Sequence, residues 1–420
     1  MVPQFPQLSE TFIVNKVLGL VDRGVDVQVV CGPTPDANWQ AFGDGHRVGE
    51  LVDRVHVAPR LGRSLTALRS ACSGAVDLLS NNRSDARRYL GDDAESLTRR
   101  LRDLAVDAPL IQLDPDVVHF EFGALAPARM KIRDRLGVAV TVSFRGYDIN
   151  YAGLNDPHFY DPVWAGADGI HVLGEDLWNR AIHRGAPPDL PHTRITPAID
   201  SSAVDPTPAR PGVLGDAANP LRVLSVGRLH WKKGYVYALE AVAGLRADGL
   251  DVEYRIVGDG DLLGAVAFWR HQLGLDECVE LLRSVPPAEV ARQLGWADVF
   301  LHSATSEGFC NAVIEAQAHG VPVVCSDADG LRENVEDGVT GFVVPRRDPG
   351  ALADRLLQLA RDPELRYRIG AAGPERVASQ FAFEDHVDAW VSFYDDALAR
   401  RHGANPQLGS TSEVRVDPQL

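Results

Sequence analysis

The chain has 420 residues, of which 45% are hydrophobic and 24% are charged, with a formal net charge of −16. This length is enough for two domains with sizeable cores, and the negative charge argues against nucleic-acid binding, which needs a basic footprint. No apolar run reaches the ~20 residues of a membrane span, and no signal peptide is visible. The five cysteines are scattered, which indicates a reducing cytoplasm.

The N-terminal half is predicted to alternate helices and strands. Thr11 to Arg23 carries an apolar stripe typical of an amphipathic helix, and Gly24 ends it. The other elements that we expect are strands at Val25–Cys31, Val52–Ala58, Val117–Phe120, Val138–Phe144, Ile170–Leu173 and Arg194–Thr196, with mostly helical chain at Leu65–Ala108. This alternation predicts an α/β domain over residues 1–200.

A second α/β domain is predicted over residues 213–382. The stretch Asp200–Asn219 is rich in Pro, Ser and Gly and is interpreted as the linker before it. We expect strands at Val223–Val226, Asp251–Val257, Asp298–Ser303 and Val321–Cys325, and helices at Tyr235–Leu245 and Asn311–Ala318. One last helix is expected at 383–400, followed by a disordered tail at 401–420.

The stretch from Thr305 to Val344 contains two glutamates, Glu307 and Glu315, on either side of a predicted helix start. The first-turn N–H groups of such a helix have no intrahelical acceptors and can bind phosphate. Glu315 is one turn inside the helix, ~6 Å along its axis from Asn311, where a carboxylate suits a vicinal diol such as ribose. Taken singly, each glutamate would be interpreted as a solvated surface charge.

Two further loops follow predicted strands in the same half. Gly227 ends the first strand, and Arg228 and Lys233 follow it, although the chain has only four lysines. Cations at a strand-to-helix turn suit phosphate binding; the alternative is a solvated basic loop. Gly258 and Gly260 end the second strand and permit close backbone approach.

The segments GRLHWKKGY, VGDG, SEGFCNAVIEAQAHGVPVVCSDADG and VEDGVTGFVVPRRDP occur in this order. They resemble the retaining GT-B glycosyltransferases of family 4. The resemblance implies two Rossmann-like domains facing a cleft, with the C-terminal helix crossing back to the N-terminal domain. It also implies a UDP- or GDP-linked sugar as donor and no other cofactor.

The resemblance further implies roles for residues of the C-terminal half. Arg228 and Lys233 would neutralise the diphosphate, and Glu315 would hold the ribose hydroxyls. Glu307 would hold the donor sugar, with the distal phosphate on the backbone that follows it. That segment comprises Gly308, Phe309, Cys310 and Asn311. No metal site is expected, because in such an enzyme Arg228, Lys233 and the helix N-terminus would stabilise the leaving diphosphate without a divalent metal.

The segment FPQLSETFI resembles the first loop and helix of the family, in which a complete strand precedes it. Only Met1–Pro3 precede it here, which is too few for a central strand. We therefore expect either a first strand that is truncated or a start codon that is misassigned.

Acceptor-side candidates lie in Ser9-Glu10-Thr11, in HFEFG, which contains His119 and Glu121, and in SFRGYD, which contains Arg145 and Asp148. Many relatives carry histidines at the positions of Glu121 and Arg145. We predict that these two residues form an ion pair within about 4 Å, the alternative being that each points separately to solvent. His119 is interpreted equally as a sugar contact or as a hydrogen-bonded strand histidine.

The expected function is transfer of a sugar, with retention and without a metal, from a nucleoside-diphosphate sugar to a hydroxyl of a glycan, lipid-linked or small-molecule acceptor. The alternatives are a sugar-nucleotide epimerase or hydrolase, a nicotinamide-dependent oxidoreductase and a catalytically inactive subunit. The oxidoreductase lacks support because Leu263 stands where a G-x-G-x-x-G motif needs its third glycine.

The arginines between Arg83 and Arg102 are relevant to where in the cell the protein is located. They could face an anionic membrane, which would make the enzyme peripheral at the inner membrane face. We favour a solvated helix in a cytoplasmic protein, because acidic residues are interleaved with these arginines and Glu95–Arg99 is an i,i+4 pair.

Overall fold

The computed structural model describes residues 1–7, 10–40, 42, 47–59, 76, 78, 83–91, 96–200 and 204–403. The chain divides into two compact units. The N-terminal unit comprises Met1–Val172, Trp178–Ile195 and Val387–Leu420, and the C-terminal unit comprises Leu173–Leu177 and Thr196–His386. Each unit is described by itself below. No helix among the described residues is long and apolar enough to cross a membrane.

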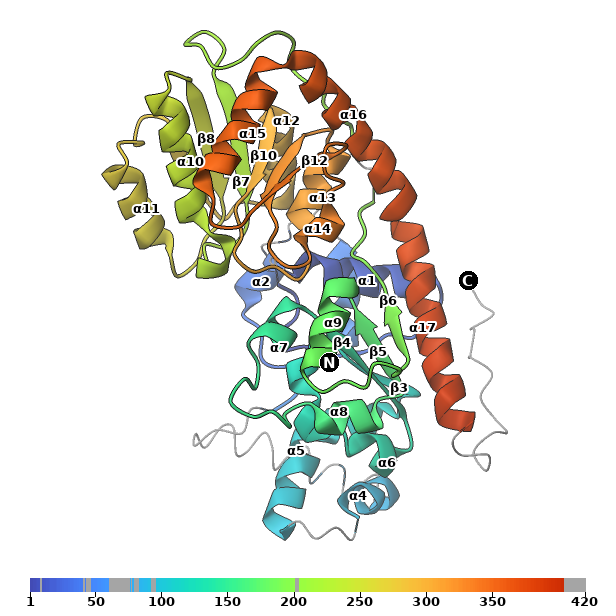
Figure 1. The fold of residues 1–420 in the computed structure, drawn as a ribbon. Coiled ribbons are helices and arrows are strands. Elements are labelled where there is room, and N and C mark those ends of the chain that lie inside the picture. The colour runs from blue at the N-terminus through green and yellow to red at the C-terminus, as the bar shows by residue number, and fades with distance from the viewer. Residues whose placement is uncertain are drawn as a thin grey trace. The chain divides into compact units, whose positions relative to one another are not determined.

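The first half of the chain alternates short strands with helices (Figure 1). Its strands are β1 (Val29–Cys31), β2 (Val55–Val57), β3 (Val117–Phe120), β4 (Ala139–Phe144), β5 (Gly169–Val172) and β6 (His192–Arg194). Its helices are α1 (Thr11–Asp22), α2 (Asp36–Gln40), α4 (Arg83–Leu90), α5 (Leu97–Leu113), α6 (Ile132–Leu136), α7 (Gly146–Asn150), α8 (Asp161–Gly166) and α9 (Glu175–His183), with 3-10 turns η2 (Arg47–Arg54), η3 (Gly123–Leu125) and η4 (Pro127–Arg129).

The second half repeats the alternation with longer elements (Figure 1). Its strands are β7 (Leu221–Val226), β8 (Val252–Val257), β9 (Val279–Arg283), β10 (Val299–His302), β11 (Val323–Ser326) and β12 (Gly341–Val344). Its helices are α10 (Tyr235–Ala247), α11 (Leu263–Gln272), α12 (Pro287–Trp296), α13 (Asn311–Ala318), α14 (Leu331–Asn334), α15 (Pro349–Arg361), α16 (Pro363–Gln380) and α17 (Phe383–Gly403), with a 3-10 turn η6 (Trp231–Lys233).

The sheet of the C-terminal unit is parallel and buried on both faces. Its strand order is β12-β11-β10-β7-β8-β9. Adjacent residues of one strand enter different cores: Val223 packs with residues of α10 and α15, and Leu224 packs with residues of α12 and α13. This two-sided burial explains why β10 (VFLH) and β11 (VVCS) are almost continuously apolar, whereas the outer strands β8 (VEYRIV) and β9 (VELLR) carry exposed charged residues.

The order of these strands creates a topological switch point between β7 and β10. The chain runs outward from β7 through β8 to β9, then returns to the other side of β7 with β10 and continues outward again. Neighbouring crossovers on either side of such a point leave a crevice at the carboxyl ends of the two central strands, where ligands bind in open α/β sheets. The loops after β7 and β10 are therefore the expected place for a ligand.

The N-terminal unit contains a four-stranded parallel sheet, β3-β4-β5-β6, and a separate pair, β1-β2. Met1–Pro3 lies between β1 and β3. The Val2 N–H donates to Val30 O and the Gly32 N–H to Pro3 O, while the Glu121 N–H donates to Met1 O. A short extended segment thus bonds to strands on both sides, although it forms only an isolated bridge, Val2 to Cys31.

The predicted α/β fold is confirmed, and several boundaries need correction. Helix α13 and strand β3 have the predicted bounds, but β1 begins at Val29 instead of Val25. The 3-10 turn η2 occupies the start of the strand predicted from Val52. The two strands pair with each other over only three residues, and β1 has one further bridge, from Cys31 to Val2. The last helix, α17, runs to Gly403, and from Val387 it belongs to the N-terminal unit.

Candidate active site

The loops that follow β7 and β10 are joined by a buried ion pair. Lys233 Nζ contacts Glu307 Oε2; the Glu307 side chain is buried, and the Lys233 side chain is 13% exposed. Burial alone would raise the pKa of Glu307, but Lys233, His302 and Lys232 hold it well below the ordinary value. Burial would lower the pKa of Lys233, and Glu307 raises it above the usual value. The pair is therefore ionised, with its charges compensated inside the C-terminal unit.

Hydrogen bonds to backbone carbonyls hold the same two loops together. The Thr305 N–H donates to Lys232 O at 2.7 Å, and Ser303 Oγ donates to Gly234 O at 2.9 Å. Gly234 has φ 64°, and a Cβ there would lie 2.2 Å from Ser303 O. Only glycine fits this position, because it needs both the left-handed conformation and the close approach. The loop geometry thus places Lys233 against Glu307.

A third loop, after β11, supports the Glu307 segment from the other side. Asp329 accepts hydrogen bonds from Ser306 Oγ at 2.6 Å, from the Glu307 N–H at 3.0 Å and from Arg346 Nη1 at 3.0 Å. A Cβ on Gly330 would lie 2.0 Å from Gly308 O, so this glycine is required by contact between the two loops. Sequence reasoning missed Asp329, although it follows a predicted strand as closely as Glu307 does.

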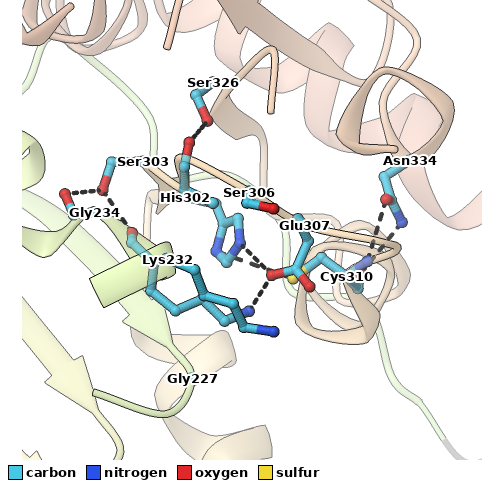
Figure 2. Close-up of polar contacts among 12 residues, drawn as sticks. Gly227, Lys232, Gly234, His302, Ser303, Ser306, Glu307, Cys310, Ser326 and Asn334 are labelled. Carbon is cyan, nitrogen blue, oxygen red and sulfur yellow. Dashed lines mark hydrogen bonds and ion pairs between the residues drawn. The ribbon is translucent and has the colours of Figure 1, made fainter. Parts of the chain in front are cut away.

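His302 and Cys310 complete the surroundings of Glu307 (Figure 2). His302 is the last residue of β10; its Nε2 lies 3.5 Å from Glu307 Oε2, and its Nδ1 lies 4.0 Å from Cys310 Sγ. Burial would raise the pKa of the Cys310 thiol, but His302 and Lys233 lower it. Sequence reasoning did not single out His302; its position at the end of a strand next to the switch point is the signal that could have found it.

The start of α13 offers fewer free donors than the sequence predicts. The Cys310 N–H donates to Asn334 Oδ1 at 3.2 Å, so this residue is not available to a phosphate in the way that we expected. The N–H groups of Phe309 and Asn311 have no hydrogen-bond partner among the described residues. Phe309 is itself buried and packs edge-on against Phe381, which fixes the chain ahead of the helix.

Three charged side chains near these loops make no hydrogen bond or ion pair with any described residue. Arg228 is exposed, Lys232 is half-buried in η6, and Glu315 is half-buried on α13. Burial lowers the pKa of Lys232 and raises the pKa of Glu315. Two cations and a carboxylate without protein partners, beside free helix N–H groups, can bind an anion that carries hydroxyl groups.

The glycines after β7 and β8 hold the loops against one another. A Cβ on Gly258 would lie 2.0 Å from Gly227 O, and one on Gly260 would lie 2.5 Å from Leu229 O. The Gly227 carbonyl also accepts a hydrogen bond from the Tyr235 hydroxyl at 2.7 Å. Gly258 and Gly260 therefore allow a neighbouring loop to approach closely, and this contact explains why both positions hold glycine.

In the N-terminal unit, the predicted pair of Glu121 and Arg145 is confirmed. Arg145 Nη2 lies 2.9 Å from Glu121 Oε2, and its Nε donates to Glu121 O at 3.1 Å. Lys16 contacts the other oxygen of Glu121, and the Arg145 guanidinium lies over the Phe12 ring at 4.2 Å. Glu121 thus has both carboxylate oxygens occupied, and burial lowers the pKa of Arg145 to about 10.

His119 lies in a continuous hydrogen-bond chain. Its Nδ1 lies 2.8 Å from Thr141 Oγ1 and its Nε2 lies 3.0 Å from Ser143 Oγ, which in turn contacts His171 Nδ1 at 2.8 Å. Trp390 of α17 packs edge-on against the His119 ring at 5.2 Å. This favours the interpretation of His119 as a hydrogen-bonded strand histidine over that of a sugar contact.

The other acceptor-side candidates have structural contacts. Asp148 is fully buried and accepts hydrogen bonds from the N–H groups of Ala124 and Arg145, each at 3.0 Å, so it caps α7. Glu10 precedes α1 and contributes to the electrostatic surroundings of Arg145. Ser9 lies outside the described residues, as do the tail at 404–420 and Glu95 of the arginine-rich segment.

Two family patterns match the sequence. The family described as "Glycosyl transferases group 1" matches residues 210–376, and the "Glycosyl transferase 4-like domain" matches residues 9–195. The amylovoran biosynthesis glycosyltransferase AmsK of Erwinia amylovora is 29% identical over 394 residues, which is 90% of this chain and 94% of AmsK. WcaL of Salmonella typhimurium, provisionally named a colanic acid biosynthesis glycosyltransferase, is 29% identical over 396 residues, with the same coverage.

Solved structures show the same fold. Anabaena HepE, solved with UDP and glucose, aligns with a TM-score of 0.67 at 16% identity, covering 94% of this chain and 98% of HepE. A glycosyltransferase from Rickettsia africae aligns with a TM-score of 0.65 at 14% identity, covering 95% of this chain and 97% of that one. The chain therefore belongs to the group 1 glycosyltransferases and has the GT-B fold.

Proposed function

We propose that this glycosyltransferase takes a nucleoside-diphosphate sugar as donor and transfers the sugar with retention to a hydroxyl of a growing polysaccharide or its precursor. The observation that carries the proposal is the meeting of Lys233 and Glu307 at the switch point between β7 and β10, beside two cations, Arg228 and Lys232, whose side chains have no partner among the described residues. The negative charge of a diphosphate can pair with these cations. The hydroxyl groups of the sugar can donate hydrogen bonds to the carboxylates.

Each part of the donor has a matching group at this edge of the sheet. Arg228, Lys232 and the N–H groups at the start of α13 suit the diphosphate. Glu315, whose carboxylate has no partner among the described residues, suits the ribose diol. Glu307, held by Lys233, suits the hydroxyls of the transferred sugar. HepE was solved with UDP and glucose, which supports a donor of this class.

The proposed reaction relies on positioning and charge stabilisation rather than on a protein nucleophile. As the bond between the sugar and the diphosphate breaks, negative charge develops on the leaving phosphate. Arg228, Lys232 and Lys233 stabilise that charge without a divalent metal. The leaving phosphate accepts the acceptor's proton on the same face, so the anomeric configuration is retained. The cytoplasmic location expected from the cysteines belongs to the same proposal.

For the acceptor, we propose only a chemical class. AmsK is named for amylovoran biosynthesis and WcaL, provisionally, for colanic acid biosynthesis, and both are similar to this chain over nine-tenths of its length. A polysaccharide repeat unit, free or lipid-linked, is therefore the acceptor class that we favour. The comparisons give no support to an epimerase.

The experiment that tests the proposal is a thermal-unfolding panel of UDP, GDP and their common sugar conjugates, with chelator present. A ligand at 100 times its Kd should stabilise the protein by about 2.7 kcal/mol. We expect one nucleotide base to stabilise strongly and the chelator to make no difference. Stabilisation by none of these compounds, or only after a divalent metal is added, would contradict the proposal.

A further inference from the structure

The side chains of His302, Glu307 and Cys310 form a compact cluster of three different metal-ligand types. One ligand atom from each residue lies within 4.8 Å of the other two, and all three residues are at least nine-tenths buried. They come from the end of β10, from the loop after it and from the start of α13. Figure 2 shows the three side chains gathered around one point.

The chemistry of this set selects a class of ion. Thiolate, imidazole and carboxylate together are the ligands of borderline-soft divalent metals, above all Zn²⁺. In a tetrahedral zinc site, Zn–S and Zn–N bonds of about 2.3 and 2.0 Å place neighbouring ligand atoms roughly 3.3 to 3.6 Å apart. The separation of 3.5 Å from His302 Nε2 to Glu307 Oε2 is close to that spacing, and one ligand atom of each of the three residues lies within 4.8 Å of the other two.

The cluster also contains an incompletely satisfied group. His302 Nε2 is buried and makes no hydrogen bond within the described residues; its polar neighbour is Glu307 Oε2, at 3.5 Å. A buried polar nitrogen without a hydrogen bond is rare, because desolvation is costly unless a partner replaces water. A metal ion within the cluster would supply such a partner.

We propose that His302, Glu307 and Cys310 form a Zn²⁺-binding site, in which the metal replaces the Lys233 ammonium as the cation on Glu307. Lys233 contacts the carboxylate, so metal and ammonium compete for it. The bound ion separates Lys233 from Glu307 and thereby inhibits binding of the sugar donor. This effect on catalysis rests on the proposed function. Metal binding itself does not rest on that function.

The competition makes an unusual prediction for variants. Glu307→Gln removes an anionic ligand and should weaken metal binding at least ten-fold. Lys233→Met removes the competing cation and should tighten it at least ten-fold. A site elsewhere on the chain would respond to neither change, and a simple loss of local structure in Lys233→Met would weaken binding instead.

Co²⁺ is the probe, because thiolate coordination produces an ultraviolet charge-transfer band that other ligands do not. The full chain, freed of metal by a chelator and of any affinity tag, is titrated with Co²⁺, and Zn²⁺ is then added to displace it. We expect the band to appear in the wild type and in Cys278→Ser, whose half-buried thiol is remote from the cluster in sequence, and in Cys72→Ser. We expect Cys310→Ser to lack it.

A measurement on the unaltered chain guards against variants that fail to fold. X-ray absorption at the zinc edge should show one sulfur at about 2.3 Å with nitrogen and oxygen at about 2.0 Å. Such a shell, together with the charge-transfer band and its loss in Cys310→Ser, supports the site. A shell without sulfur, a band that persists in Cys310→Ser, or the absence of stoichiometric binding overturns it.

Discussion

The loop edge around Glu307 and the cluster around Glu121 both contain a buried carboxylate bound to a lysine or arginine. They differ in what surrounds the pair. Around Glu307, Arg228, Lys232 and Glu315 make no hydrogen bond or ion pair with the described residues. Around Glu121, Lys16 and Arg145 occupy both carboxylate oxygens, and Asp148 caps a helix. A ligand site keeps charged groups available, whereas a structural cluster satisfies them internally.

The largest effect is expected at the Lys233–Glu307 pair. Lys233→Met leaves Glu307 buried without its ion-pair partner, so we expect a loss of about 3 kcal/mol in the free energy of unfolding. Loss of a cation near the leaving phosphate should also lower the transfer rate at least 100-fold. Chemical denaturation and initial-rate assays measure the two effects.

The double variant Lys233→Met/Glu307→Gln separates stability from catalysis. Removing both charges should restore most of the lost stability, because no unpaired ion remains in the core. The transfer rate should stay at least 100-fold low. Recovery of the rate together with stability would show that the pair has only a structural role and would remove the contrast with Glu121.

A smaller effect is expected at the structural cluster. Arg145→Met removes one of the two cations on Glu121 and should cost about 3 kcal/mol in the free energy of unfolding. Nucleotide affinity should stay within two-fold of the wild type, because Arg145 belongs to the N-terminal unit. A ten-fold loss of nucleotide affinity in this variant would assign a donor role to Arg145.

The smallest effect concerns pH. Burial raises the pKa of Asp148 to about 6, although hydrogen bonds from backbone N–H groups oppose the shift. The folded state therefore keeps this proton at pH values where the unfolded carboxyl, of pKa about 3.9, has lost it. The stability that this residue contributes is present below pH 4, and about 2 kcal/mol of it is lost as pH rises from 4 through 6 to 7.

The comparison for this prediction is Asp148→Asn, which keeps an amide oxygen to accept one N–H. We expect the wild type to lose about 2 kcal/mol of unfolding free energy relative to the variant as the pH rises from 4 to 7. A constant difference across that range would show that Asp148 is ionised throughout.

Local sequence signals predicted the elements that strong patterns specify. Helix α13 has the expected bounds because Gly320 and Pro322 end it and a loop of turn residues precedes it. Strand β1 is shorter than predicted because its length depends on its partner β2, which pairs over only three residues. The apolar pattern of Val25–Cys31 contains no information about that partner.

The predicted site differs from the observed one where contacts depend on distant chain. Gly258 was recognised as a position for close approach, but only the fold shows that Gly227 O is what approaches it. His302 was interpreted only as part of a strand, since its contacts with Glu307 and Cys310 depend on where the loop returns. The pairing of Glu121 with Arg145 was predictable, because consecutive parallel strands end at the same edge.

The central claim is that the unpaired cations beside β7 and β10 bind the donor's diphosphate, and calorimetric titration tests it most directly. The ligand is the nucleoside diphosphate that stabilises the wild type most. We predict that Arg228→Ala raises its Kd about ten-fold, the equivalent of roughly 1.4 kcal/mol, with an unchanged free energy of unfolding, and that Arg145→Met leaves the Kd unchanged. Equal affinity in Arg228→Ala and wild type, or a loss only in Arg145→Met, would contradict the account.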